Sequence, residues 1–242
     1  MNVKPTPALA GGPDRKPHSR GRQRRRLAVV VAVAVVILAC TLARGQLLRA
    51  AASLLINEDP GETADFVLPL AGARSFAEAA RLCRSGQAAG VLLIPSKPEF
   101  AQTLGVLPMD EELMRRELAR AGIGDNTVTT VLSQVDNDWS RFRLLGVWLA
   151  DHPDARVRLV CGRLQSARCR HLLRAVLPKE AVARVRLLAL ARPEFDETNW
   201  WNRKEGMLDV CNSSLSYAHI LLCGEDDEKA PWNPDQYEKN LR

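Results

Sequence analysis

The chain has 242 residues, 46% hydrophobic and 26% charged, so it can bury a core and is not disordered throughout. Its net charge of +6 is concentrated at one end: residues 1–26 carry eight Lys or Arg and one Asp, which makes +7 there and leaves −1 for residues 27–242. The part that can fold is therefore close to neutral. A nucleic-acid partner, which the overall charge suggests at first sight, is not expected.

The first two segments in chain order are a basic tail and an apolar run. Residues 1–26 are rich in Pro, Gly and Arg and are expected to be a disordered cytoplasmic tail. Residues 27–42 (LAVVVAVAVVILACTL) hold no charge and are bracketed by Arg24–Arg26 and Arg44. At 1.5 Å per residue the run is about 24 Å long as a helix, slightly short of a hydrocarbon core. We predict a single transmembrane anchor over residues 27–44.

The arginine block also predicts the orientation of that anchor. Positively charged flanks stay on the cytoplasmic side, so the rest of the chain is expected outside an inner or plasma membrane. Two other outcomes stay open, a cleaved signal peptide and lipoprotein processing at Cys40. The tail before the run is long and no A-x-A cleavage site follows it directly, which favours an anchor.

Beyond the anchor we expect a juxtamembrane segment at 45–56, one folded domain at 57–224 and a mobile polar tail at 225–242. Within the domain, apolar runs of strand length alternate with helical patterns. The predicted strands are 64–71, 90–95, 127–132, 157–161 and 185–190, and the predicted helices are 74–85, 110–121, 136–149, 164–176 and 203–222.

This alternation predicts an α/β domain with a mostly parallel sheet covered on both faces, a Rossmann-like three-layer sandwich preceded by one N-terminal transmembrane helix. A ligand would bind at the carboxyl ends of the strands. The cysteines form no CxxC motif and no zinc-like spacing, and they are expected to be mostly buried, unpaired thiols. Cys161, in an apolar strand, is expected to be structural and not a nucleophile.

The segment from Asn199 to Met207 (NWWNRKEGM) is the most distinctive part of the sequence. It resembles the "nWWrsreGl" signature of the SanA/ElyC/YdcF-like family, a bacterial cell-envelope domain of largely unknown function. Further segments match in the same order: Ala64–Leu68 with the family's first strand, Arg74 to Gly86 with its first helix, Leu118 to Ile123 with a helix end, and Val157–Arg168 with the strand and helix that follow. The resemblance covers residues 57–224 and implies a Rossmann-like fold and an envelope location.

Several positions depart from the family pattern. The family's glycine-rich first loop is reduced to Gly72 with its neighbours, its His is replaced by Gln165, and the Glu of its last helix is replaced by Ser213. The acid-bearing loop survives only loosely, as Asp136 to Asp138. Since Gln165 cannot titrate near neutral pH, these losses imply a site that binds rather than turns over.

The ligand-binding candidates are Gly72, Arg74, Asp136, Asp138, Gln165, Arg168 and Trp200. A glycine turn at a helix N-terminus can bind an anion, and arginines can pair with phosphate or carboxylate. Each residue also has an ordinary interpretation: a plain turn at Gly72, a solvated or salt-bridged Arg168, and a packing role for Trp200. No resident metal is predicted. The only cofactor considered as a hypothesis is Mg²⁺, held by the loop from Asp136 to Asp138.

Three functions remain open on these grounds. The first is a membrane-anchored envelope protein that binds an anionic ligand, such as a phosphorylated or nucleotide-like small molecule, or a partner from the envelope. The second is an active enzyme on a phosphorylated or nucleotide-like envelope precursor, using Arg74, Arg168 and Mg²⁺. The third is a structural assembly factor. The lost titratable positions favour the first.

Overall fold

The computed structural model describes residues 19–61 and 63–224, with some side chains of the first helix left out. The chain divides into two compact units, Met1–Leu47 and Leu48–Arg242. The expected C-terminal tail, residues 225–242, and most of the expected N-terminal tail lie outside the described residues.

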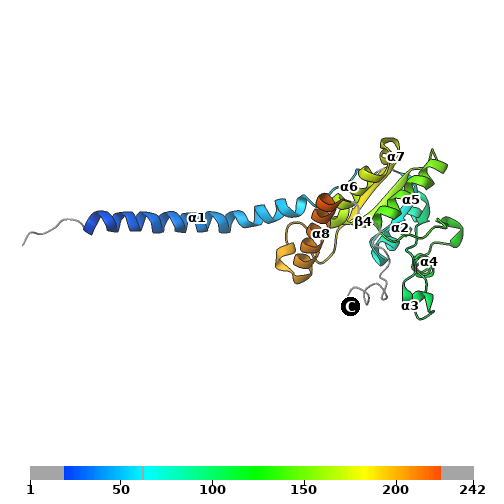
Figure 1. Ribbon diagram of the computed structural model, residues 1–242, viewed down its shortest axis with the longest axis horizontal. Helices are drawn as coiled ribbons and strands as arrows, with labels where there is room; N and C mark the ends of the chain where they lie inside the picture. The colour runs from blue at the N-terminus through cyan, green and yellow to red at the C-terminus, as the bar shows by residue number, and fades with distance from the viewer. Residues whose placement is uncertain (1–18, 62, 225–242) are drawn as a thin grey trace, which may run out of the picture. The chain divides into compact units, whose positions relative to one another are not determined.

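The first helix, α1, runs over Ser19–Ser53 (Figure 1). It begins inside the segment expected to be disordered, because Arg and Gln at 20–26 are good helix formers ahead of an apolar run. Within the described residues, none of the helices combines the length and the apolar character that crossing a membrane requires. The anchor over 27–44 therefore stays a prediction from the sequence.

The second unit contains a five-stranded sheet in which every pair is parallel. The spatial order is β3-β2-β1-β4-β5. The chain first builds the sheet from β1 to β3 in one direction and then returns to add β4 and β5 on the other side of β1. The switch point of the sheet therefore lies between the neighbouring strands β1 and β4. The strands are β1 (Ala64–Pro69), β2 (Ala88–Leu93), β3 (Val128–Thr130), β4 (Val157–Gly162) and β5 (Val185–Leu190). The predicted α/β class and the parallel sheet are confirmed, and the strand order is Rossmann-like.

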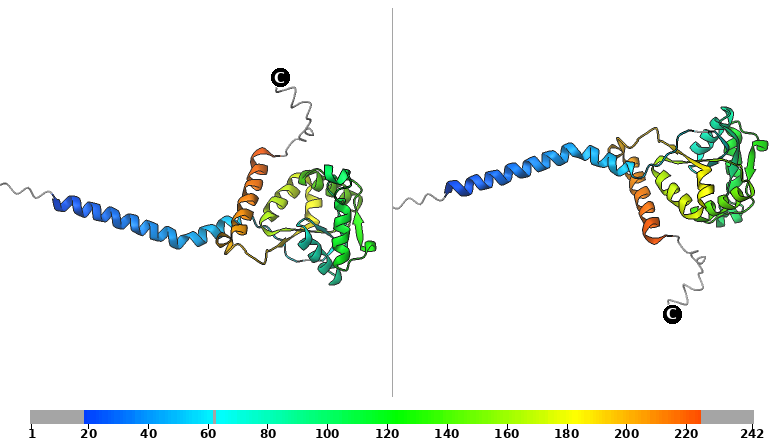
Figure 2. Two further views of the ribbon diagram at one scale, coloured as in Figure 1. Left: turned by 90° about the horizontal axis from the view of Figure 1, so that it is seen from below. Right: turned by 90° about the horizontal axis from the view of Figure 1, so that it is seen from above.

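Helices connect successive strands, and one further helix follows the last strand in the chain (Figure 2). They are α2 (Ala73–Arg84), α3 (Phe100–Thr103), α4 (Asp110–Arg120), α5 (Asp138–Asp151), α6 (Ser166–Val176), α7 (Lys179–Ala183) and α8 (Lys204–Cys223). The five predicted helices of the domain are present with small shifts at their ends. The short helices α3 and α7 were not predicted, because so few residues hold too few apolar positions to show a period.

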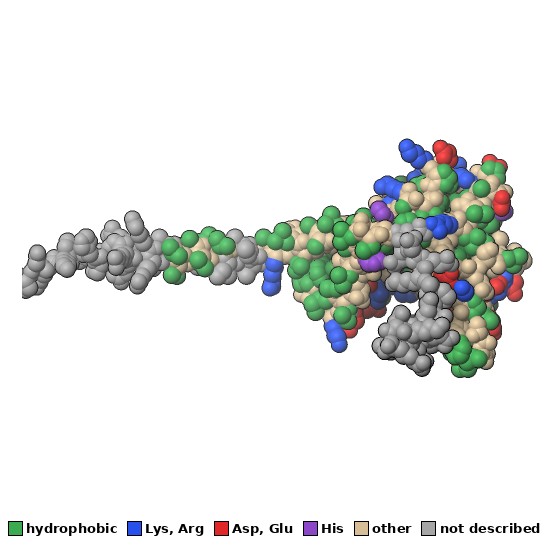
Figure 3. Space-filling view, viewed as in Figure 1, with side chains coloured by type: hydrophobic (Ala, Val, Ile, Leu, Met, Phe, Trp, Pro, Cys, Tyr) green, Lys and Arg blue, Asp and Glu red, His purple; other side chains and the backbone are tan. Residues whose placement is uncertain are grey.

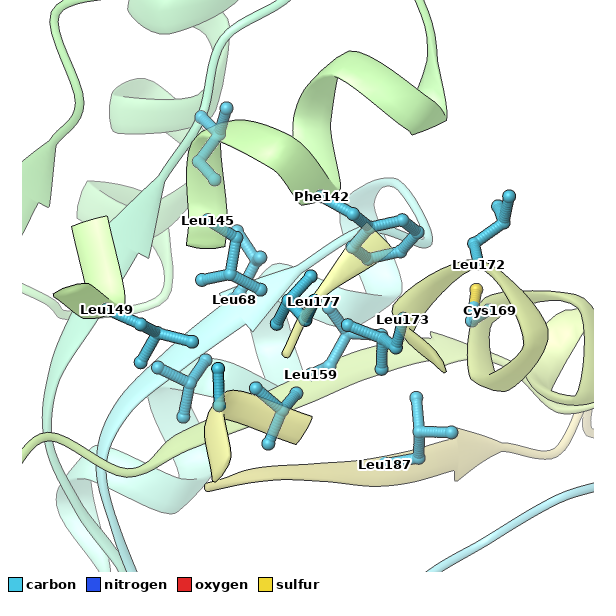
Figure 4. Packing of buried hydrophobic residues seen from close by; sticks show 14 of the residues in the cluster. Leu68, Phe142, Leu145, Leu149, Leu159, Cys169, Leu172, Leu173, Leu177 and Leu187 are labelled. Atoms are coloured by element: carbon cyan, nitrogen blue, oxygen red, sulfur yellow. The ribbon is translucent and has the colours of Figure 1, made fainter. Parts of the chain in front are cut away.

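Two hydrophobic clusters, one on each face of the sheet, explain why the strands are so apolar. On one face, α5 and α6 bury Phe142, Leu145 and Leu173 against Leu68 and Leu159 of the sheet (Figure 4). On the other face, α2 contributes the apolar stripe that the sequence predicted for residues 74–85, and α4 adds Leu118. Both pack with Val67, Val91 and Val160 of the sheet. Since successive strand residues point to opposite faces, near-continuous apolar runs serve both clusters.

A third cluster joins the end of α1 to the C-terminal part of the domain. Ala52 and Leu55 are buried with Trp200 and Val210, and the Trp200 indole Nε1 donates to the carbonyl of Leu48 at 3.2 Å. Residues 48–56, expected as part of a juxtamembrane segment, therefore pack as part of the folded unit.

Candidate functional site

A cavity of about 460 Å³ lies at the carboxyl ends of β1, β4 and β5. It sits where the strand order reverses between β1 and β4, which is where ligands bind in open parallel sheets. We call it the switch-point cavity. Its lining residues are Leu70, Ala71, Ala73, Arg74, Gly162, Arg163, Leu164, Gln165, Leu190, Arg192, Phe195, Asp196, Glu197 and Asp209.

The first wall of this cavity is the turn from β1 into α2. Gly72 has φ 66° and ψ −156°, a backbone conformation that side chains disfavour, and a Cβ at this position would meet no atom within 4 Å. The Ser75 hydroxyl holds the turn, since it accepts from the Ala71 N–H at 3.1 Å and donates to the Gly72 carbonyl at 2.7 Å. The Ser75 N–H donates to the Gly72 carbonyl at 2.9 Å. The N–H groups of Ala73 and Arg74, which precede it in α2, have no acceptor within the helix, so this end of the wall favours an anion.

Arg74, in the first turn of α2, is exposed and lines the cavity. Its Nη2 donates to the carbonyl of Ala191, in the loop after β5. Within the described residues no carboxylate pairs with Arg74, so its charge is oriented by a neutral acceptor and is not neutralised.

The other two arginines of the cavity are paired with acids. Arg163 binds Glu197 through two hydrogen bonds of 3.0 and 2.8 Å, and its Nη1 lies 3.4 Å from Glu58. Arg192 lies 3.1 Å from Asp209 of α8 and stacks over Phe195 at 5.6 Å. These pairs hold the loop after β5 against β4 and α8, so they build the walls of the cavity.

The acids after β5 stay ionised under ordinary conditions. The hydrogen bonds from Arg163 lower the pKa of the Glu197 carboxyl below its usual value. Hydrogen bonds from the hydroxyl and N–H of Thr198 lower the pKa of Asp196 in the same direction. A carboxylate with a lowered pKa is a poor general acid at neutral pH, but it still accepts hydrogen bonds from hydroxyl or amino groups of a ligand.

The predicted site residues do not all converge. Arg74 and Gln165 line the switch-point cavity, where the Gln165 amide lies over Gly162, and Gly72 lies between the lining residues Ala71 and Ala73 without lining the cavity itself. Arg168 instead pairs with Asp138 at 2.6 Å, and Arg141 holds the same carboxylate at 2.7 Å. Those two predicted residues, Arg168 and Asp138, line a separate hollow of about 690 Å³ beside α8.

Asp136 and Trp200 lie elsewhere again. Asp136 is 3.4 Å from Lys97 on the surface, and Trp200 is a core residue of the third cluster. A Cβ on Gly206 would lie 2.4 Å from the Trp200 carbonyl oxygen, so only glycine lets α8 start this close to the Trp200 backbone. The Trp and Gly of the distinctive motif therefore pack the start of α8.

The buried thiols offer no nucleophile to the cavity. A hydrogen bond with Cys169 and burial raise the pKa of Cys161 well above its ordinary value, which keeps it protonated. Burial also raises the pKa of Cys83. Cys161 and Cys169 are buried, whereas Cys211 and Cys223 are exposed, contrary to the general expectation of burial.

The sequence interpretation missed the loop after β5, which supplies Arg192, Phe195, Asp196 and Glu197. A signal was available: this loop leaves the carboxyl end of a predicted strand, and ligands of open parallel sheets bind outside those ends. Within residues 19–61 and 63–224, no group of three or more His, Cys, Asp or Glu is arranged to hold a metal ion.

Comparisons with known proteins add no identification. The chain matches no protein-family model, no curated protein and no solved structure. The class that the fold defines is a Rossmann-like α/β domain with a cavity at its switch point.

Proposed function

We propose that this protein is a membrane-anchored envelope protein of the YdcF-like type whose α/β domain binds a small anionic molecule in the switch-point cavity without turning it over. The ligand class is a phosphorylated or nucleotide-like molecule. The observation that carries the proposal is Arg74, a cation with no described carboxylate partner, in the first turn of α2 at the mouth of a cavity of about 460 Å³.

The local chemistry supports an anion at this end of the cavity. The first turn of α2 contributes free N–H groups and the positive end of the helix dipole, and Arg74 adds a full charge beside them. A phosphate there would accept from both the backbone and the guanidinium. Across the cavity, Asp196 remains as an acceptor for hydroxyl or amino groups, which suits a phosphorylated molecule that also carries sugar hydroxyls.

Binding without turnover is supported by the residue types of the lining. No His, Cys, Ser, Thr, Tyr or Lys is among the residues that line the cavity. Two of its three acids are held ionised, by Arg163 and by Thr198. With lowered pKa values, Asp196 and Glu197 do not supply the general acid or base of near-neutral pKa that efficient proton transfer needs. The third acid, Asp209, pairs with Arg192. The acids proposed for Mg²⁺, Asp136 and Asp138, are instead bound to Lys97, Arg141 and Arg168.

The test is ligand binding to the full chain, purified in a non-ionic detergent. Calorimetric titration with nucleoside monophosphates, nucleoside diphosphates and sugar phosphates should find saturable binding to the wild type that is weakened at least about tenfold in Arg74→Ala. The matched control is Arg116→Ala, which removes an exposed arginine of α4. Absence of saturable binding would leave a structural assembly role, and release of product from a bound ligand would establish an enzyme.

Attachment to the membrane by residues 27–44 is a separate part of the proposal. The large apolar side chains described in α1 between Val29 and Leu38 are more than half exposed, and Figure 3 shows hydrophobic side chains along this part of the helix on the face in view. Such a surface is stable in lipid and costly in water. We expect the full-length product in the membrane fraction, resistant to carbonate extraction. An intact mass that includes residues 1–26 would distinguish an anchor from cleavage at a signal site or before Cys40.

A further inference from the structure

The last helix of the domain, α8, presents two sets of residues on opposite faces, and it lies at the margin of the domain (Figure 2). The first set is buried against the domain and consists of Gly206, Val210, Ser213 and Ile220. The second set is exposed and consists of Leu208, Cys211, Leu215, Ala218 and Leu222. The three exposed leucines each stand two residues after a buried position, and two residues turn a helix by about 200°. The second set therefore forms the outer face, and we call it the outer stripe.

The outer stripe has the spacing of a coiled-coil seam. Its members follow one another at intervals of three, four, three and four residues, with leucine at each a position and Cys211 and Ala218 at the d positions. Leu208, Leu215 and Leu222 are 54%, 70% and 85% exposed. A single exposed leucine is ordinary, but an apolar stripe sustained over about four turns of one helix indicates a contact with another element.

The surface beside the outer stripe is hollowed. Leu215, Ala218 and Leu222 line the hollow of about 690 Å³ beside α8, together with Trp139 of α5. Such a hollow leaves room for the side chains of a further helix, which insert between those of the first. Leu208 is not among the residues that line it, so only an elongated element such as a helix covers the whole outer stripe.

The charges of α8 favour a second copy of the same helix over other occupants. Between residues 206 and 223 the sequence has one Asp, Glu, Lys or Arg, which is Asp209, and it pairs with Arg192. Two copies of α8 therefore meet along the outer stripe without opposed like charges, and the charged flanking positions that select a different helix are missing from this sequence. A twofold arrangement uses the same stripe on both copies. Helices that lie on a bilayer surface carry Lys and Arg along their polar face, which residues 206–223 lack.

The outer stripe is short, but α8 does not have to fold on its own. Two heptads fall below the roughly three that a free coiled coil shows. The inner face already holds α8 in place, since Ile220 packs in the main hydrophobic cluster of the domain and Val210 in the cluster around Trp200. Pairing of two preformed helices involves no cost of helix formation, so burial of the exposed leucines favours association directly.

We propose that α8 is a self-association helix, through which two copies of this chain pair along the outer stripe. The pairing buries Leu208, Leu215 and Leu222 of each copy against the same stripe of the other copy. The described lining of the switch-point cavity includes none of these leucines, so the pairing does not depend on the proposed ligand.

The test measures the mass of the full chain by sedimentation equilibrium in a density-matched non-ionic detergent. The wild type should be a dimer, and Leu215→Lys should raise its dissociation constant at least about tenfold, because two like charges then meet in the middle of the seam. The matched control is Leu104→Lys, at a leucine beside α3 that is 62% exposed, and it should keep the wild-type dissociation constant. A dimer that survives Leu215→Lys unchanged would place the contact elsewhere and overturn the proposal. A monomeric wild type would overturn it as well, and would leave a bilayer surface or residues 225–242 as the occupant of the outer stripe.

Cys211 gives a second readout, because its thiol is exposed within the outer stripe. Two other thiols that can link copies are removed by Cys40→Ser and Cys223→Ser, and the protein is oxidised with copper phenanthroline. Parallel helices should give a disulfide between the two copies of Cys211, whereas antiparallel helices should require Ala218→Cys as the second thiol. The control carries Cys211→Ser with Leu104→Cys and should remain unlinked. If neither Cys211 nor the Ala218→Cys variant links two copies beyond this control, the outer stripes do not face each other and the proposal is wrong.

Discussion

Two buried arginines of this domain, Arg170 and Arg158, differ in whether an acidic side chain among the described residues pairs with them. Arg170 of α6 is 6% exposed and pairs with Asp59, and its Nε also donates to the side chain of Asn57 at 3.2 Å. Arg158 of β4 is 4% exposed and has no partner among the described residues. The difference shows that burial alone does not define the role of a charged residue, since within residues 19–61 and 63–224 Arg170 has an acid partner and Arg158 has none.

The Arg170 pair has an evident structural task. Asp59 donates its backbone N–H to the Leu187 carbonyl at 3.1 Å and accepts from the Leu187 N–H through its side chain at 2.7 Å. It therefore covers the free edge of β5 and ties the segment before β1 to α6. An exposed sheet edge invites pairing with other chains, so this ion pair both fixes the segment and protects the edge.

Removing Asp59 should have the largest effect of the changes considered, because it converts the paired arginine into an unpaired one. Asp59→Ala is expected to cost about 3–5 kcal/mol of unfolding free energy, the usual result of leaving a buried charge without its partner. Urea denaturation of the full chain in detergent measures this. Asp196→Ala, at an exposed acid, should cost far less. Equal losses in the two variants would show that the Asp59–Arg170 pair is no stronger than a surface contact.

The ionisation of Asp59 makes the stability of the fold depend on pH. Burial by itself raises the pKa of Asp59, but hydrogen bonds from Arg170 and the Leu187 N–H, with the charges of Arg170 and Arg186, outweigh it and lower the pKa below its ordinary value of 3.8. Because the folded-state pKa is the lower one, this carboxylate contributes its full stability above pH 3.8 and loses it as the pH falls through the folded-state pKa.

We therefore expect the wild type to lose stability below pH 3.8 more steeply than Asp59→Asn, which cannot titrate at that position. Midpoints of urea unfolding at pH 6, 4 and 3 measure the two slopes. Parallel slopes for the two proteins would mean that Asp59 is not stabilised in its charged form. Arg158→Met should retain the wild-type slope, since Arg158 has no carboxylate partner among the described residues.

Glu197→Gln should have a smaller effect on stability, but it turns a paired arginine of the switch-point cavity into a free one. The Arg163–Glu197 pair is bidentate and both side chains are a little over a quarter exposed, so its loss is expected to cost about 1 kcal/mol. Arg163 would then be available beside Arg74. The affinity for a phosphorylated ligand should rise a few-fold, which calorimetry with the wild type as reference can measure. A weakened affinity would mean that Glu197 itself holds the ligand.

The general architecture could be read from the sequence because one local signal sets it. Apolar runs such as 90–95 and 185–190 have to be buried on both faces, and the intervening amphipathic helices supply that cover, so the parallel sheet follows. The ends were harder: β3 covers only Val128–Thr130, where 127–132 was predicted, because it pairs with β2 alone at the edge of the sheet. A strand at the edge is paired on one side only. At the other edge β5 keeps its predicted bounds, and there Asp59 bonds Leu187 on the free side.

The site was predicted only in part, for a physical reason that Arg74 and Arg168 illustrate. Both arginines follow a strand and begin a helix, so their sequence contexts are nearly equivalent. Arg74 bonds a neutral carbonyl at the cavity, while Arg168 is neutralised by Asp138, thirty residues earlier in the chain. Which charge finds an internal partner depends on packing between helices that are distant in sequence, and a residue pattern does not contain that information.

The smallest effect is expected at a pair that resembles Arg170–Asp59 in composition but lies in solvent. Arg116 and Glu112 are four residues apart on α4, 2.7 Å from each other, and both are about half exposed. Water already solvates each charge, so the pair gains little and loses side-chain freedom when it forms. Glu112→Ala should change the unfolding free energy by no more than about 0.5 kcal/mol, and the change should vanish in high salt because exposed pairs are screened. Comparing the loss of unfolding free energy in Glu112→Ala with that in Asp59→Ala shows how much burial adds to the strength of an arginine–carboxylate pair. If both losses vanished equally in salt, the Asp59–Arg170 contact would be an exposed pair, and the contrast between Arg170 and Arg158 would no longer hold.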